Sequence, residues 1–325
     1  MADRGIDVAS RLDEMHLEVY QGMPERPLDV TDIPGSVAAM REHSAQREIE
    51  PLPDGVTTED RYAPGPDGAP DVLVRLYRPD GLEPGGPAFY WIHGGGMVVG
   101  SVDGSDGFCG QQALDLGILV ASVEYRLAPE HPYPAPIEDC YAGLKWFAGA
   151  AGELGIDSAR IAIGGGSAGG GLCAGLALLA RDRGEIDVCF QLLVYPMIDD
   201  RNISNSSHAI TDPRLWNREK NTIGWSSYLA GNNGGEDVPV YAAPARATNL
   251  EGLPPAYINV GALDLFVDES IDYAQALNAA GVRTELHVYP VAFHGSPNSV
   301  SESPISQQWA ADQQNALRGA LFGDG

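Results

Sequence analysis

One stretch of the sequence, from Arg160 to Gly184, constrains the fold more than any other: RIAIGGGSAGGGLCAGLALLARDRG. The apolar run 161–163 predicts a buried strand, a glycine cluster follows it, and the next apolar segment is long enough for a helix. This order is typical of two kinds of site. Residues 164–169 match the G-x-G-x-x-G loop that binds a dinucleotide pyrophosphate. Residues 165–169 match the G-x-S-x-G elbow that presents a serine nucleophile, here Ser167.

Apolar runs alternate with helical patterns along most of the chain. We predict strands over residues 72–77, 88–92, 118–123, 161–163, 190–195, 256–260 and 285–289. We predict helices over residues 8–20, 36–49, 137–150, 170–183, 266–280 and 306–321. Residues 51–70, rich in Pro, Gly and Asp, are expected to be a connector. This alternation predicts an α/β fold with a mostly parallel central sheet flanked by helices on both faces.

A polar and aromatic stretch, residues 201–243, interrupts this alternation and is expected to be an insertion between two core strands. Trp216, Trp225 and Tyr228 lie within it. We expect these three side chains either to line a substrate entrance or to pack between helices of the insertion.

The charge and the cysteines exclude several classes of function. With 45 acidic and 20 basic residues, the formal net charge is −25, which disfavours nucleic acid and anionic membrane surfaces as partners. The chain has no apolar run of about 18 residues, so no transmembrane helix is expected. Its first residues do not resemble a secretory signal. The cysteines show no C-x-x-C pair, so we expect reduced thiols, no zinc site and a cytoplasmic location.

The dinucleotide interpretation finds little support further along the chain. It requires an acidic residue about 20 residues after the glycines, at the end of the next strand. Glu185 and Asp187 precede that predicted strand, and Asp199 and Asp200 follow it. The G-x-G-x-x-G match alone is a weak signal in a chain with 40 glycines.

The elbow interpretation makes stricter demands, and the sequence meets them. A serine nucleophile needs a histidine base, a carboxylate that orients the base, and backbone N–H donors for the oxyanion. Asp264 follows the predicted strand 256–260, and His294 follows the predicted strand 285–289, so both lie at the sheet edge of the elbow. The glycines of residues 93–96 follow the predicted strand 88–92, where they let the backbone approach a substrate.

Together these motifs resemble the bacterial hormone-sensitive-lipase family of α/β-hydrolase esterases, from about residue 70 to the C-terminus. The resemblance rests on HGGG at 93–96, YRLAPEHPYPA at 125–135, GGSAGG at 165–170, DLFVDE at 264–269 and YPVAFHG at 289–295. The family usually has Asp or Thr where this chain has Gly166. The resemblance implies an α/β-hydrolase fold with a helical cap, built from residues 1–50 and the insertion 202–240. The catalytic core would comprise residues 51–201 and 241–325.

The resemblance also implies a role for each site residue. Ser167 is expected to be the nucleophile, His294 the general acid and base, and Asp264 the carboxylate that orients it. Asp268 and Glu269 compete with Asp264 but lie further into the next predicted helix. The expected oxyanion donors are the N–H groups of Gly95, Gly96 and Ala168. His93 is expected to hold the glycine loop by hydrogen bonds, and Arg126 and Glu130 are expected to form an ion pair under the site.

We therefore expect a serine carboxylesterase that hydrolyses small-molecule esters with short- to medium-chain acyl groups, through an acyl-enzyme and without a metal or organic cofactor. Two alternatives stay open. A peptidase or acyltransferase uses the same triad on this fold, and a binding protein that has lost catalysis has the same architecture. The sequence leaves the natural substrate and a homodimer open.

Overall fold

The structure is a computed structural model of the 325-residue chain and describes residues 5–46, 48–66 and 68–323. Within these residues, strands form one eight-stranded sheet in the order β1-β2-β4-β3-β5-β6-β7-β8. The strands are β1 (Val56–Ala63), β2 (Val72–Pro79), β3 (Gly86–Ile92), β4 (Leu119–Val123), β5 (Ile156–Gly166), β6 (Phe190–Val194), β7 (Ala256–Gly261) and β8 (Thr284–Tyr289). β2 pairs antiparallel with β1 and β4, and all other neighbours are parallel. The predicted mostly parallel sheet is confirmed.

Helices follow most of these strands. They are α1 (Glu14–Gly22), α2 (Ile33–Ala45), α3 (Asp106–Leu116), α4 (Ala135–Gly149), α5 (Ala151–Leu154), α6 (Ala168–Arg183), α7 (Asn205–Ala209), α8 (Arg218–Tyr228), α9 (Val267–Ala279), α10 (Ser296–Ser299) and α11 (Pro304–Phe322). Short 3₁₀ helices are η1 (Ala9–Arg11), η2 (Asp103–Ser105) and η3 (Pro244–Arg246). The helix predicted over residues 8–20 is therefore two separate pieces, η1 and α1.

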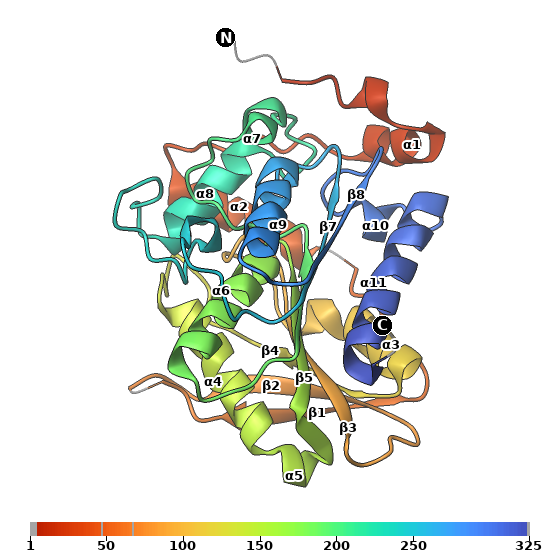
Figure 1. Cartoon of the computed structure of the whole chain (residues 1–325). Helices are drawn as coiled ribbons and strands as arrows, with labels where there is room; N and C mark the ends of the chain where they lie inside the picture. The colour runs from red at the N-terminus through yellow and green to blue at the C-terminus, as the bar shows by residue number, and fades with distance from the viewer. Residues whose placement is uncertain (1–4, 47, 67, 324–325) are drawn as a thin grey trace.

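Side chains along the central strands alternate between two hydrophobic cores, one on each face of the sheet. On β3, Tyr90 and Ile92 belong to the larger core, whereas Phe89 and Trp91 belong to the smaller one. Helices α4, α6 and α9 cover the larger core, and α3 and α11 cover the other (Figure 1). Both faces are buried, which explains why the strands read as continuous apolar runs.

The expectation of a connector over residues 51–70 is wrong in part, because β1 lies within it. β1 is the edge strand of the sheet and has only β2 beside it. Most of its side chains are exposed, so its sequence, VTTEDRYA, carries little apolar signal. Helix α3 was not predicted from the sequence either.

Segments far apart in the sequence lie together above the carboxyl ends of the parallel strands. Helices α1, α2, α7 and α8 occupy the upper part of Figure 1, and α2 contacts α8. Arg41 of α2 donates hydrogen bonds to the carbonyl oxygens of Val98 and Ala128, both at 3.0 Å. The N-terminal helices are thus tied to loops at the carboxyl edge of the sheet.

Candidate active site

Ser167 is the single residue between β5 and α6, and its backbone has φ 59° and ψ −120°. A positive φ is uncommon for a residue with a side chain, and such strained turns gather at functional sites. The backbone segments on either side of this turn pack so closely that two of its positions have no room for a side chain. A methyl group added at Gly165 would overlap the Gly169 backbone, and one added at Gly169 would overlap the carbonyl oxygens of Ile92 and His93. Only 7% of Ser167 is exposed.

The structure brings Ser167, His294 and Asp264 together. His294 lies in the loop after β8, and its Nε2 is 3.0 Å from Ser167 Oγ. Asp264 lies between β7 and α9, and its Oδ2 is 2.8 Å from His294 Nδ1. Because an ionised carboxylate only accepts hydrogen bonds, Nδ1 carries the proton, and Nε2 of the neutral ring is free to accept from the serine hydroxyl. The other oxygen of Asp264 accepts from the Phe266 N–H at 3.0 Å, which fixes the carboxylate.

Aromatic rings on two sides hold the His294 imidazole. The ring of Tyr195 lies 4.6 Å from it, and the ring of Phe266 meets it edge-on at 5.3 Å. Neither residue is among the site residues predicted from the sequence. Tyr195 directly follows β6, the strand between β5 and β7, so its place at the same sheet edge is the signal that points to it.

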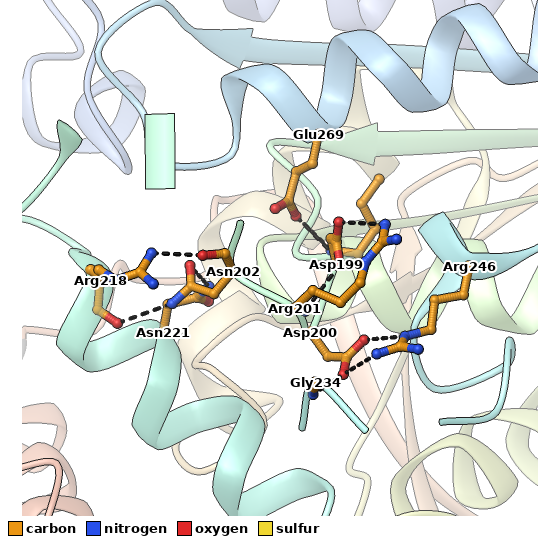
Figure 2. Close-up of polar contacts among 10 residues, drawn as sticks. Asp199, Asp200, Arg201, Asn202, Arg218, Asn221, Gly234, Arg246 and Glu269 are labelled. Carbon is orange, nitrogen blue, oxygen red and sulfur yellow. Dashed lines mark hydrogen bonds and ion pairs between the residues drawn. The ribbon is translucent and has the colours of Figure 1, made fainter. Parts of the chain in front are cut away.

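The two acids that compete with Asp264 have other partners. Asp268 accepts a hydrogen bond from the Ser206 N–H at 2.8 Å. Glu269 accepts from the Ile198 N–H at 2.9 Å and points toward the turn that contains Asp199 (Figure 2). Burial raises the pKa of Glu269 well above its usual value. Neither acid contacts His294, so the geometry favours Asp264.

The loop of residues 93–96, which is predicted to supply oxyanion donors and is called the oxyanion loop below, lies directly beside the elbow. A methyl group added at Gly94 would come within 2.7 Å of the Gly166 carbonyl oxygen. Gly95 and Gly96 have φ values of 117° and 61°, which glycine adopts readily. Within the described residues, neither of their N–H groups donates to a backbone or side-chain acceptor. Ala168 is the first residue of α6, so its N–H has no acceptor inside the helix.

His93 holds this loop, as the sequence predicts. Its Nδ1 is 2.8 Å from the Gly94 carbonyl oxygen, and its ring stacks on Tyr125 at 4.2 Å. The Tyr125 hydroxyl donates back to the His93 carbonyl oxygen at 2.9 Å. Burial lowers the pKa of His93 to about 4, so its imidazole is neutral at pH 7.

Comparison with known families decides between the two interpretations of the glycine turn. The family profile described as alpha/beta hydrolase fold matches residues 89–298, well over half of the chain. This chain is an α/β hydrolase. The dinucleotide alternative is therefore set aside.

Relatives place this α/β hydrolase in the bacterial hormone-sensitive-lipase branch. Esterase LipI of Mycobacterium tuberculosis is 36% identical over 99% of this chain and 99% of its own length. Carboxylesterase NlhH of the same organism is 37% identical over 88% of this chain and 89% of its own. A solved structure titled Bacterial Heroin Esterase superposes with a TM-score of 0.87 at 42% identity, covering 96% of this chain and 98% of that one. The predicted family and the prediction of an enzyme are confirmed.

The three aromatic residues of the insertion, which were expected either to line an entrance or to pack between helices, differ in their positions, and only Trp216 lies beside the candidate site. A methyl group added at Gly96 would overlap Trp216 Cη2, so the indole edge covers this glycine. The Trp216 ring is also 6.1 Å from the ring of His294. Trp225 and Tyr228 are fully buried and belong to the larger core, so for them packing is the correct interpretation.

The predicted pair of Arg126 with Glu130 is wrong. Arg126 instead binds Asp139 of α4, with both side-chain contacts at 2.7 Å and its backbone N–H at 3.0 Å from the same carboxylate. Asp139 is 1% exposed. Glu130 lies at the surface and pairs with Arg41 at 2.7 Å. Burial explains the choice, because a buried carboxylate needs a charged partner more than an exposed one does.

In the described residues, no three His, Cys, Asp or Glu side chains are grouped so that they could hold a metal. The four cysteines are free thiols, with Cys109, Cys140 and Cys173 buried. No helix in residues 5–46, 48–66 or 68–323 is both long and apolar enough to cross a membrane. The cytoplasmic location and a homodimer stay predictions.

Proposed function

We propose that this α/β hydrolase is a carboxylic ester hydrolase in which Ser167 is the nucleophile, His294 the general base and acid, and Asp264 its orienting carboxylate. One observation carries the proposal. Ser167 Oγ, the His294 imidazole and the Asp264 carboxylate form a continuous hydrogen-bonded chain, at 3.0 and 2.8 Å. The esterase names of relatives that align over nearly the whole chain support the same reaction.

The reaction proceeds in two halves. In the first, His294 Nε2 takes the hydroxyl proton while Ser167 Oγ bonds to the ester carbonyl carbon. The tetrahedral intermediate collapses, the bond to the alcohol oxygen breaks, and Nε2 gives its proton to that oxygen. In the second half, water is the nucleophile: it loses a proton to Nε2, and its oxygen attacks the carbonyl carbon of the acyl-enzyme. Collapse of the second intermediate returns the proton to Ser167 Oγ and releases the carboxylic acid.

Backbone groups supply the electrostatic stabilisation in this proposal. The N–H groups of Gly95, Gly96 and Ala168 are the donors for the oxygen that becomes negative in each intermediate. Ala168 adds the positive end of the α6 helix dipole at the same point. Removal of one such donor in related sites costs about 10²–10³ in kcat.

We also propose that residues 1–50 and 202–240 form a cap over the core of residues 51–201 and 241–325. The contact of α2 with α8 above the carboxyl edge of the sheet supports this division (Figure 1). Helix α8 comes close to the site, since a methyl group added at Gly224 would be 3.0 Å from the Gly96 carbonyl oxygen. We expect a cap this close to limit the depth of the acyl pocket, which would favour short- to medium-chain acyl groups.

The test is covalent labelling together with turnover. A p-nitrophenyl phosphonate, which forms a stable bond to an activated serine, is expected to add one equivalent at Ser167, located by peptide mass spectrometry. Ser167→Ala is expected to lose at least about 10³-fold in ester hydrolysis. The exposed Ser158, changed to Ala, is the matched control and keeps full activity. Labelling of another serine, with an active Ser167→Ala enzyme, would contradict the assignment. Labelling without any turnover would indicate a binding protein.

A further inference from the structure

A short turn, residues 199–202, lies between β6 and α7 and makes polar contacts in three directions (Figure 2). Asp199 binds Arg201, and its N–H donates to Glu269. Asp200 accepts from Arg246 at 2.5 and 2.9 Å and from the Gly234 N–H at 2.6 Å. Asn202 contacts helix α8 through Arg218, Asn221 and Thr222. The turn is therefore a fixed platform between the core and α8.

The third branch of this platform leads to the active site. Asn221 Nδ2 donates to Asn202 Oδ1 at 3.2 Å, and Asn221 Oδ1 accepts from Trp216 Nε1 at 3.4 Å. Asn221 is fully buried and Asn202 is 7% exposed. Buried amides keep both of their partners, because an unpaired polar group is costly to bury. Asn202 thus sets the orientation of the Asn221 amide, which in turn presents an acceptor to the indole N–H.

Trp216 meets two parts of the site at once. Its Cη2 edge covers Gly96, a proposed oxyanion donor, and its ring lies 6.1 Å from the ring of His294. Trp216 is only partly buried. The indole therefore forms a wall between the oxyanion loop and the base.

We propose that Trp216 is a specificity-determining residue that limits the size of the alcohol half of the ester, and that Asn221 and Asn202 are positioning residues that hold its indole. This inference rests on the proposed ester hydrolysis and goes beyond it.

The chemistry of the reaction decides which half of the substrate meets this wall. The leaving oxygen must lie next to His294 Nε2, because it receives its proton from that atom. The carbonyl oxygen must lie next to the N–H of Gly96. The indole contacts this glycine and faces His294, so the group attached to the leaving oxygen is the one that meets it. The acyl chain leaves the carbonyl carbon in a third direction.

Two ester series separate the halves. One keeps the acetyl group and enlarges the alcohol from methyl to isopropyl, tert-butyl and benzyl, and the other keeps a methyl alcohol and lengthens the acyl chain. Acid release is followed by pH-stat titration. Trp216→Ala is expected to raise kcat/KM for tert-butyl acetate, relative to that for methyl acetate, by about tenfold or more. The relative kcat/KM values within the acyl series are expected to change by less than about twofold. An equal change in both series, or a change in the acyl series alone, overturns the proposal.

A double-mutant cycle tests the positioning role. We call the kcat/KM for tert-butyl acetate divided by that for methyl acetate the alcohol ratio. Asn221→Leu is expected to shift this ratio about threefold to fivefold in the wild-type background, where it frees the indole N–H. In a Trp216→Phe background, which has no N–H to hold, the same change is expected to shift the ratio by less than about twofold. Equal shifts in both backgrounds overturn the role of Asn221. Should Asn221→Leu fail to fold, Asn221→Ser, whose hydroxyl is too short to replace the amide, takes its place.

The control is a variant that destabilises the turn of residues 199–202 but keeps the contacts from Asn202 through Asn221 to Trp216. Arg246→Gln breaks the ion pair with Asp200 and is expected to lower the thermal midpoint while leaving the alcohol ratio unchanged. If Arg246→Gln shifts the ratio as much as Asn221→Leu, the platform acts only through general stability, and the positioning role is wrong. Absence of ester hydrolysis in the wild-type enzyme would instead contradict the proposed function itself.

Discussion

The imidazole of His16 on α1 lies edge-on to the ring of Phe293, with the ring centroids 6.1 Å apart. Phe293 directly precedes His294, the proposed base. Tyr20, one turn further along α1, also packs on Phe293, at 6.4 Å, and its hydroxyl donates to Asp212 of the insertion. The N-terminal helix therefore supports the histidine loop from outside and joins it to the insertion.

His16→Ala tests whether this contact positions the base. The His16 side chain is fully buried, so its loss is expected to lower the free energy of unfolding by about 2–4 kcal/mol. Because the change loosens Phe293 and not the substrate pocket, kcat is expected to fall more than KM rises. Tyr20→Phe is the control, since it keeps the ring on Phe293 and removes only the bond to Asp212. A lower stability with unchanged kcat would limit the role of His16 to folding.

The choice of Asp264 over Asp268 makes a second prediction. Asp264→Asn is expected to lower kcat by about 10⁴-fold, because an amide cannot hold the productive tautomer of the histidine. Asp268→Asn is expected to keep kcat close to wild type and to lose about 1 kcal/mol of stability, since its carboxylate binds the Ser206 N–H. Steady-state kinetics on both variants, with circular dichroism as a check of folding, decides the matter. An inactive Asp268→Asn beside an active Asp264→Asn would reverse the assignment.

His93 makes the stability of the fold depend on pH. Its folded-state pKa of about 4 lies below the ordinary value of about 6.5, so between these values the unfolded chain binds more protons. Stability from neutral His93 is therefore complete above about pH 6.5 and is lost as the pH falls toward 4, by about 3 kcal/mol in all. Urea unfolding at pH 7.5 and pH 4.5 is expected to show a smaller loss for His93→Asn than for the wild-type enzyme. Equal losses in both proteins would show that His93 does not titrate in this way.

The two ion pairs that replace the predicted Arg126–Glu130 pair differ in burial, and so in energy. Arg126→Met leaves the buried carboxylate of Asp139 without its partner and is expected to cost about 3–5 kcal/mol of stability. Glu130→Gln breaks an exposed pair with Arg41 and is expected to cost about 0–1 kcal/mol. Thermal unfolding of both variants checks the difference. Similar losses would mean that Glu130 matters more to the fold than its exposure indicates.

These pairs show where inference from the sequence ends. The motifs around Ser167, Asp264 and His294 indicate strand ends that parallel pairing brings to one edge, so their meeting is predictable from the sequence alone. The partner of Arg126 is not, because Asp139 and Glu130 are both near in sequence and only the packing of α4 decides which one is buried.

Edge elements and side-chain networks escape sequence inference for a related reason. β1 is mostly exposed, so it lacks the apolar pattern by which the central strands are recognised. The link from Asn202 through Asn221 to Trp216 depends on two buried amides whose partners lie on different elements. No periodicity in the sequence predicts such a contact. The motif at 93–96 does predict the functional glycine that Trp216 covers.

The depth of the acyl pocket gives the last prediction. Helix α8 packs against the glycine loop of residues 93–96 at Gly224, and α1 covers the loop of His294, so we expect the proposed cap to limit how far an acyl chain extends from Ser167. Each buried CH₂ adds about 0.8 kcal/mol of binding until the pocket is full, and further methylenes must stay in water or displace the cap. We expect kcat/KM across a series of p-nitrophenyl esters to peak at acyl chains of about two to eight carbons and then to fall. Emulsified triglycerides with long chains are expected to be poor substrates. A maximum at about twelve carbons or more, or activation by an oil–water interface, would mean that the cap opens and that pocket depth does not set the preference.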